Sequence, residues 1–399
     1  MTGAMVDHDV AKYRKFSRNL AWILYLTGLW SNEKSLGIFY RFVRVIVGLI
    51  FFLMGLVILN FCHFHRSNLS LMLKGLSLFL STVLIVLKIV CFTVNRTCLV
   101  DLYKDLGKVY DQDLEDETLR PYLLADLTLT TRSFRISALM VFGTLSSYVV
   151  PAVAFMYYQS RNHINPVKYV LPFPGVYPWP IETTTIYIPH FLFELFVAVG
   201  IFTTTVGVDS TFILFAMQIC GETRTLAYQF RQFSFAEDQR LALKKCLARH
   251  LLLLRSRNNL QTLFGPIVFF LFLSSAVIMC VLVFQLVQTV NLSLGKSILF
   301  ALYFIVKIQQ ALAYAWAGTL FTSESNGLLD SLYSSQWTDI TDLRIRKSIL
   351  IILGQKPMIL RGSGFFDVSV NTFLSMLQTA VSYFFLLQTL EGKDEECKL

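Results

Sequence analysis

The sequence predicts an all-α, polytopic membrane protein with seven transmembrane helices, a cytoplasmic N-terminus, an extracellular C-terminus and a helical anchor bundle on the cytoplasmic side. The first observation behind this prediction is composition: 55% of the residues are hydrophobic, 15% are charged, and the mean hydropathy is +0.57. A soluble domain needs far more charge on its surface. The other two observations are the recurrence of long apolar runs and the uneven distribution of basic residues between them.

Each apolar run matches the roughly 20 residues that an α-helix needs to cross a hydrocarbon core of about 30 Å. The first run begins far from Met1, which disfavours a cleavable signal peptide. We therefore expect residues 1–42 to form a cytoplasmic segment and residues 391–399 to form an extracellular tail. The seven runs cover approximately 43–62, 71–94, 135–158, 187–218, 264–288, 297–321 and 368–390.

Basic residues are concentrated in the connections on one side of the predicted spans. Of the 35 Lys and Arg residues, 26 lie before the first span or in every second connection after it, whereas six lie on the other side. Because cytoplasmic connections carry an excess of Lys and Arg, the N-terminus is expected inside the cell. The net charge of +9 therefore reflects topology, and we expect no nucleic-acid partner.

Two cytoplasmic connections are charged but carry apolar residues at helical spacing. Residues 222–263 are expected to extend spans four and five as amphipathic helices, and residues 322–367 to form further helices around a turn at Trp337. We expect Gly265 and Pro266 to interrupt the chain where span five begins, because proline lacks the amide proton that a helix interior uses. Together these helices predict a compact inner bundle that anchors one subunit to another.

The longest extracellular connection contains the stretch VLPFPGVYPWP, in which prolines and aromatic residues alternate. Proline fixes φ and removes a hydrogen-bond donor, so this stretch is neither regular helix nor central strand. We interpret it as an apolar lid over the outer mouth of the bundle. A structured loop that rests at the membrane surface is the alternative interpretation.

Few patterns indicate covalent or metal chemistry. The seven cysteines include no CxxC pair, and the sequence contains no P-loop, nucleophile elbow or HExxH motif. His63 and His65 have no third ligand nearby in the sequence, so we expect no metal, no cofactor and no enzyme activity. Asn68 and Asn291 stand in sequons on the predicted outer side and are candidate glycosylation sites, whereas Asn95 stands in a sequon on the inner side.

Four ionisable residues lie within the predicted spans, where a charge is costly. Lys88 and Asp209 lie toward the inner ends, and we expect them to pair or to extend toward the interface. Lys307 lies in the middle of its span beside two glutamines and is a candidate to face a cavity. The fourth residue is Glu194.

Hydroxyl-bearing residues follow one face of the last span, while the opposite positions are apolar. Polar side chains that face lipid are costly, so this face should meet protein or water. One interpretation is contact between helices through small hydroxyl residues. The other is the wall of a water-filled conduit shared by several subunits and narrowed by Leu386 and Leu390. The residues at spacings of three and four are Thr372, Ser375, Thr379, Ser382, Leu386 and Thr389.

The last eighty residues or so resemble the C-terminal signature of insect odorant receptors. The stretch SESNGLLDSLYSSQW has the Glu-Ser helix and the Trp turn of that signature. The stretch IRKSILIILGQKPMILRGSGFFDVSVNTFLSMLQTAVSYFF has its basic helix, Gln-Lys-Pro end, Gly-Phe-Phe turn and final Ser-Tyr helix. The matching residues are Ser323, Glu324, Ser325, Trp337, Gln355, Lys356, Pro357, Gly364, Phe366, Thr372, Phe373, Ser382 and Tyr383.

The resemblance implies a ligand-gated, non-selective cation channel in the plasma membrane of olfactory sensory neurons. It implies a heterotetramer of odorant-binding subunits and odorant co-receptor subunits, with a small volatile odorant, membrane lipid and permeant cations as the other partners. The co-receptor has a much longer second inner connection than this chain, so we interpret the chain as the odorant-binding subunit. Span seven then lines the pore, and the positions that match the gate are Ser382, Leu386, Thr389 and Leu390.

The resemblance also implies an odorant pocket in the outer halves of spans two, three, four and six. Aromatic walls with few hydroxyls suit a small, mostly apolar volatile such as an ester, alcohol or aldehyde. Mapped onto helical faces, the candidate residues are Phe79, Ser81, Val83, Ser147, Tyr148, Pro151, Phe196, Gly200, Thr203, Tyr303, Phe304 and Lys307.

Two other receptor classes share seven helices. A receptor coupled to G proteins keeps its N-terminus outside, against the charge distribution, and carries a cysteine in its second outer loop, which the sequence lacks. The related gustatory receptors share the architecture but assemble without a dedicated partner, and the sequence leaves that class open.

Overall fold

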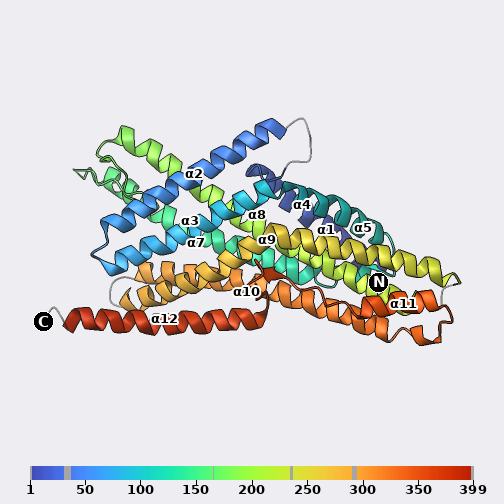
Figure 1. Cartoon of the computed structure of the whole chain (residues 1–399). Helices are drawn as coiled ribbons and strands as arrows, with labels where there is room; N and C mark the ends of the chain where they lie inside the picture. The colour runs from blue at the N-terminus through green and yellow to red at the C-terminus, as the bar shows by residue number, and fades with distance from the viewer. Residues whose placement is uncertain (1, 31–36, 165, 234–236, 290–293, 397–399) are drawn as a thin grey trace.

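The computed structural model describes residues 2–30, 37–164, 166–233, 237–289 and 294–396. Figure 1 shows a long bundle of helices, with α11 at the end opposite the C-terminus. The long helices are α1 (Thr2–Leu26), α2 (Gly37–Phe64), α3 (Leu69–Val94), α7 (Leu127–Arg161), α8 (Thr184–Gln232), α9 (Gln239–Thr289), α10 (Leu294–Tyr333) and α12 (Val370–Glu396).

Shorter elements fill the connections between the long helices. They are α4 (Arg96–Asp101), the π-helix η1 (Leu102–Leu106), α5 (Gly107–Asp113), α6 (Arg120–Leu124), the 3₁₀ helix η3 (Trp337–Asp339), α11 (Leu343–Leu353), and the strands β1 (Arg361–Gly362) and β2 (Phe366–Asp367). The two strands pair antiparallel as a small hairpin that precedes α12.

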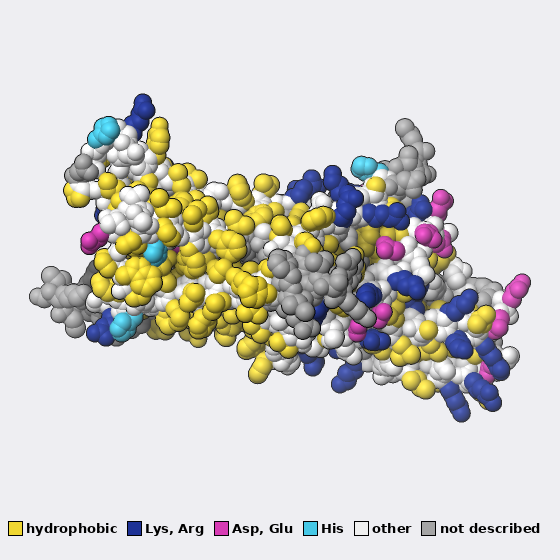
Figure 2. Space-filling model, turned by 90° about the horizontal axis from the view of Figure 1, so that it is seen from above, with side chains coloured by type: hydrophobic (Ala, Val, Ile, Leu, Met, Phe, Trp, Pro, Cys, Tyr) yellow, Lys and Arg dark blue, Asp and Glu magenta, His cyan; other side chains and the backbone are white. Residues whose placement is uncertain are grey.

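Six helices among the described residues are long and apolar enough to cross a membrane, and the seventh predicted span falls on α12, whose apolar part covers Val370–Leu386. Figure 2 shows hydrophobic side chains over one half of the visible face, while most of the Lys and Arg residues gather over the other half. A hydrophobic belt beside a basic end is the surface expected of a membrane-embedded bundle with a cytoplasmic extension. The all-helical, multi-pass membrane fold is therefore confirmed.

The helix α9 crosses the point where an interruption was expected. Pro266 lies inside this 51-residue helix, so the predicted break at Gly265 and Pro266 is wrong. Its neighbours Phe264 and Ile267 are 1% and 0% exposed, so tight packing surrounds the proline where the helix continues through it. Membrane helices tolerate proline where neighbouring helices constrain the backbone, and α7 and α8 likewise contain Pro151 and Pro189.

Ion pairs join the cytoplasmic ends of the helices. Arg224 of α8 contacts Asp126 at 2.6 Å and Glu324 of α10 at 2.8 Å. Arg249 of α9 contacts Asp113 of α5 at 2.6 Å. These partly buried pairs tie separate segments together, as expected for an anchor bundle in which apolar contacts alone do not fix register.

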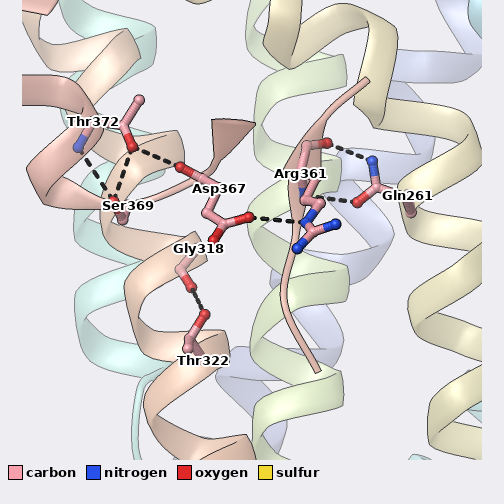
Figure 3. A network of polar contacts seen from close by, with 7 residues as sticks. All are labelled: Gln261, Gly318, Thr322, Arg361, Asp367, Ser369 and Thr372. Carbon is pink, nitrogen blue, oxygen red and sulfur yellow. Dashed lines mark hydrogen bonds and ion pairs between the residues drawn. The ribbon is translucent and has the colours of Figure 1, made fainter. Parts of the chain in front are cut away.

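The hairpin is fastened to α9 before the chain turns into α12. Figure 3 shows Gln261 of α9 hydrogen bonded to both backbone groups of Arg361, whose side chain contacts Asp367 at 2.9 Å. The Thr372 hydroxyl donates to the Asp367 carbonyl at 2.6 Å and closes the first turn of α12. The start of α12 is therefore held in place from several directions.

Candidate functional site

An enclosed cavity lies between α2, α3, α7, α8 and α10 in the membrane half of the bundle. Its volume is about 90 Å³, counted as the space that the centre of a water molecule can reach. One water needs roughly 10–15 Å³ on this measure, so the cavity has room for several waters or for one small molecule. The lining residues are mostly apolar, with Met54, Ile58, Leu78, Leu84, Ile85, Val141, Leu145, Val197, Ile201 and Val306 among them.

One end of the cavity rests on a buried polar network around Asp209. The Lys88 ammonium contacts Asp209 Oδ1 at 2.5 Å, and the Tyr314 hydroxyl donates to the same oxygen at 2.7 Å. Gln310 Nε2 donates to Asp209 Oδ2 at 2.6 Å. Lys88 is 0% exposed and Asp209 is 6% exposed, so the expected pairing of these two residues is confirmed. A buried charge persists only when it is paired and hydrogen bonded in this way.

Lys307 also lines the cavity, but its ammonium has a different environment. The side chain is 6% exposed, and Nζ lies 5.6 Å from the centre of the Tyr303 ring. This geometry is a cation–π contact rather than a salt bridge. The Tyr303 hydroxyl is in turn hydrogen bonded to Ser81 Oγ at 2.5 Å.

The proline-rich loop reaches down into the bundle and closes the cavity. Phe173 lines the cavity, and its backbone amide donates to Glu194 Oε2 at 2.8 Å. The Tyr177 hydroxyl donates to the other carboxylate oxygen at 3.0 Å. Burial raises the pKa of the Tyr177 hydroxyl and the nearby Glu194 charge raises it further, so Tyr177 remains a donor. This anchoring supports the interpretation of the loop as a lid.

The structure divides the predicted pocket residues into two groups. Ser81, Tyr148, Tyr303 and Lys307 line the cavity. The other eight lie on the same helices but outside the lining: Phe79, Val83, Ser147, Pro151, Phe196, Gly200, Thr203 and Phe304.

Those eight residues lie outside the cavity lining. An apolar sequence does not reveal which side of a helix faces the inside of the bundle. Phe196 is 52% exposed on the outer surface of α8, while the cavity is lined one residue further on by Val197. Gly200 instead allows the Phe51 ring of α2 to approach α8 closely. A helix that is hydrophobic on every side gives no periodic signal for the inward direction.

Several lining residues lie outside the predicted set. Phe173 comes from the loop, and Met54 and Ile58 come from α2, a helix that the mapping did not include. Lys88 and Gln310 bring the Asp209 network to the cavity wall. The one sequence signal that points to them is the presence of charged residues within apolar spans, which marks functional positions in membrane proteins.

The helix α12 packs against its own chain along one face only. Phe373, Met376 and Ala380 are buried at 5%, 7% and 5% exposure, against α9 and α10. On the opposite face Ser375, Thr379, Ser382 and Thr389 are exposed, Thr372 is half-buried, and Leu386 is 53% exposed. Figure 1 shows α12 along the edge of the bundle. Contact between helices within this chain therefore does not account for the hydroxyl face.

The hydroxyls on that face are hydrogen bonded to their own helix. Ser375 Oγ donates to the Asn371 carbonyl at 3.1 Å, and Thr379 Oγ1 donates to the Ser375 carbonyl at 2.8 Å. Ser382 and Thr389 donate to backbone carbonyls in the same way. Leu390 belongs to α12, but its side chain lies outside the described residues.

Of the two outer sequons, Asn68 lies at an exposed position and caps α3. Its Oδ1 accepts a hydrogen bond from the Leu71 amide at 3.2 Å, so the side-chain nitrogen is not the capping atom. Asn291 lies outside the described residues. Asn68 therefore remains a candidate glycosylation site with a geometry compatible with modification.

A multi-pass helical bundle that encloses an apolar cavity under an anchored loop has the architecture of a membrane receptor for small ligands. The family model described as the 7tm odorant receptor matches residues 68–381. The chain belongs to the odorant receptor family, rather than to either of the two other seven-helix classes. The assignment makes it a receptor and not an enzyme.

Relatives with similar sequences are odorant receptors. The chain is 24% identical to odorant receptor 82a of Drosophila melanogaster over 344 residues, 84% of this chain and 88% of that receptor. It is 26% identical to odorant receptor 47a of the same species over 251 residues, 60% of this chain and 64% of that receptor.

The fold is similar to that of the insect olfactory receptor OR5 from Machilis hrabei, solved in complex with eugenol. The TM-score is 0.79 at 16% identity, and the match covers 96% of this chain and 100% of the other. The structure of the same receptor described without eugenol gives a TM-score of 0.76 at 17% identity, covering 94% and 97%.

Proposed function

We propose that this chain is the odorant-binding subunit of a ligand-gated, non-selective cation channel. In this proposal, it assembles with odorant co-receptor subunits into a heterotetramer in the plasma membrane of olfactory sensory neurons. A small volatile occupies the enclosed cavity, and α12 lines a central pore with Ser382, Leu386, Thr389 and Leu390 around the gate.

The observation that carries the proposal is the one-sided packing of α12. This helix buries the face around Met376 against its own chain and presents the hydroxyl face around Ser382 outward. A polar face on a membrane helix requires protein or water opposite it. Because one helix does not enclose a pore, the hydroxyl face is best explained by an aqueous axis shared among subunits.

A physical link between the cavity and the pore helix runs along α10. Tyr303 and Lys307 of α10 line the cavity, and Tyr314, about two turns further on, bonds to Asp209. Thr319, between one and two turns beyond Tyr314, accepts a hydrogen bond at 2.9 Å from the amide of Val370, the first residue of α12. A ligand that binds more tightly when α10 is shifted would therefore also displace the base of α12.

Co-expression with the odorant co-receptor and a panel of volatiles tests the proposal. We expect an evoked cation current from the complex and none from the co-receptor partner alone with the same volatile. Absence of evoked current across a broad panel, with the complex at the cell surface, would contradict the proposal.

Substitution of Leu386 tests the pore assignment separately. Leu386→Ser replaces an exposed leucine of the proposed gate by a small polar residue, so basal current should rise as dewetting becomes less favourable. Leu374→Ser is the matched control, because Leu374 is 49% exposed but lies about 120° around the axis of α12 from Leu386. Equal basal currents in wild type and Leu386→Ser would remove Leu386 from the gate.

A further inference from the structure

The cavity wall contains hydrogen-bond donors, and most of them are already satisfied by protein acceptors. The Thr82 and Thr144 hydroxyls donate to carbonyls of their own helices at 2.9 Å. Lys88 and Gln310 donate to Asp209, and Ser81 is bonded to Tyr303. The Ser81, Thr82, Thr144 and Tyr303 hydroxyl protons are therefore committed to protein acceptors, while the Lys88 ammonium and the Gln310 amide are held toward the Asp209 carboxylate.

The Lys307 ammonium is the charged exception. Among the described residues it forms no hydrogen bond and no salt bridge, and its contact is with the face of Tyr303. The carboxylate of Asp209 is already engaged by Lys88, Tyr314 and Gln310. The carboxylate of Glu194 is engaged by the loop at Phe173 and Tyr177.

A buried ammonium keeps three donors and requires an acceptor to offset the loss of water. Lys307 is 6% exposed and lines the cavity, so the contents of the cavity are the remaining source of that acceptor. The rest of the lining, including Leu145, Ile201 and Val306, is apolar and excludes a strongly polar body. The complementary ligand therefore has an apolar skeleton and one strong oxygen acceptor.

We propose that Lys307 selects ligands that carry a carbonyl-type oxygen, either the neutral carbonyl of an ester, ketone or aldehyde or the carboxylate of a short-chain acid. This inference rests on the proposed function and names the ligand class for its cavity. The oxygen accepts a hydrogen bond from Lys307 Nζ, while the alkyl part packs on the apolar wall. The hydroxyls of Tyr148 and Thr205 also line the cavity and form no hydrogen bond within the described part of the chain, so they can supply a second, weaker contact.

The test compares aldehydes, ketones, esters, carboxylic acids, alcohols and hydrocarbons of matched carbon number on the complex with the co-receptor. We expect the most potent compound to carry a carbonyl or carboxylate oxygen, for example a ketone or a carboxylic acid rather than the matching alkane. Lys307→Met should raise its half-maximal concentration by about tenfold or more, the loss expected for a charged hydrogen bond. Responses to hydrocarbons should be unchanged or stronger.

A further variant distinguishes donor chemistry from disruption of the wall. Lys307→Gln keeps a donor but removes the charge, so ketone responses should be largely retained while carboxylic acid responses fall. The relative potency of a ketone and an acid on the wild type identifies whether Lys307 binds a neutral carbonyl oxygen or a carboxylate oxygen. Surface labelling shows that each variant reaches the cell surface.

Defined outcomes overturn this assignment. A hydrocarbon or alcohol as the most potent class contradicts it, as does an unchanged carbonyl response in Lys307→Met. If Lys307→Met does not reach the surface, equal effects of Lys307→Gln on ketones and acids contradict it. A wild-type complex that stays silent to every compound rejects the proposed function itself, whereas current with unchanged Lys307 variants rejects only the role of Lys307.

Discussion

At the scale of single residues, Asp209 accepts three hydrogen bonds at one end of the cavity. Its two carboxylate oxygens accept from Lys88, Gln310 and Tyr314, which come from α3 and α10, whereas Asp209 itself belongs to α8. Three helices that wall the cavity thus meet at one side chain. In a membrane interior, such a group acts as a fixed point because no water is present to replace a lost partner.

Replacing Asp209 by leucine should strongly destabilise the chain. The change leaves the Lys88 ammonium buried without its partner, which costs about 3–5 kcal/mol for buried pairs of this kind. The measurement is the melting temperature of the detergent-solubilised protein, monitored by size-exclusion chromatography after heating. The double variant Lys88→Met with Asp209→Leu should recover part of the loss. No recovery in the double variant would show that the unpaired Lys88 charge is not the main cause of the destabilisation.

Glu194 is the residue that holds the proline-rich loop against the cavity. Glu194→Ala removes the acceptor for both the Phe173 amide and the Tyr177 hydroxyl, so Phe173 should no longer be fixed over the ligand and potency should fall several-fold. Tyr177→Phe removes only one of these bonds and should have a smaller effect. The measurement is a concentration–response curve for the most potent volatile. A larger loss in Tyr177→Phe than in Glu194→Ala would exclude this role.

The residues of the site differ in how far the sequence predicts them. Lys307 is prominent because a charge within an apolar span is rare, and the expectation that it faces a cavity is confirmed. Phe196 is exposed whereas the adjacent Val197 lines the cavity, and hydropathy does not separate the two because both residues are apolar. Phe173 was unpredictable as a lining residue, since its position depends on a tertiary contact with Glu194.

At the scale of secondary-structure elements, α10 and α12 meet where Gly318 faces the segment before α12. A Cβ atom at Gly318 would overlap the carbonyl oxygen and side chain of Val368, so only glycine allows this approach. The Thr319 hydroxyl accepts from the Val370 amide beside this contact. The junction is therefore tight, so we expect a shift of α10 to displace the start of α12.

Gly318→Ala should reduce the maximal evoked current while leaving the potency of the volatile less affected. The added methyl group pushes the base of α12 away from α10, far from the cavity. Gly327→Ala is a matched control, because a Cβ at this glycine of the same helix meets nothing within 4 Å. Whole-cell current normalised to surface labelling gives the comparison. Indistinguishable currents for both variants would contradict coupling through this junction.

Hydropathy predicted the positions of the long helices in most places. Each predicted span lies within, or within two residues of, a long helix, because the need to satisfy backbone groups in lipid leaves few alternatives. The break expected at Pro266 did not occur, since tertiary packing of Phe264 and Ile267 outweighs local propensity. The hairpin of β1 and β2 gave no sequence signal, because strands of two residues are too short for periodicity.

At the scale of the whole molecule, charge segregation indicates which end lies in the cytoplasm. The ion pairs of Arg224 and Arg249 join helix ends on the predicted cytoplasmic side. Figure 2 shows most of the visible Lys and Arg residues over one half of the molecule. The outer end bears the proline-rich loop and Asn68, which caps α3. This orientation determines which sequon meets the glycosylation machinery of the secretory pathway.

Asn68→Gln should remove one glycan and increase gel mobility of the full-length chain. Asn95→Gln is the control, because Asn95 lies at the opposite end of α3, on the predicted cytoplasmic side, and should carry no glycan. The measurement is mobility before and after treatment with a glycosidase. A mobility shift for Asn95→Gln would reverse the proposed orientation.

The internal hydrogen bonding of Ser375, Thr379 and Ser382 has a consequence for ion permeation. Each hydroxyl proton is committed to a carbonyl of the preceding turn, so only oxygen lone pairs face outward. Lone pairs attract positive ions and repel negative ones, yet a single neutral oxygen per turn is too weak to strip away hydration water. If α12 lines a pore as proposed, cations would pass along this surface with their water shells largely intact, and the wall would sort ions by sign rather than by size.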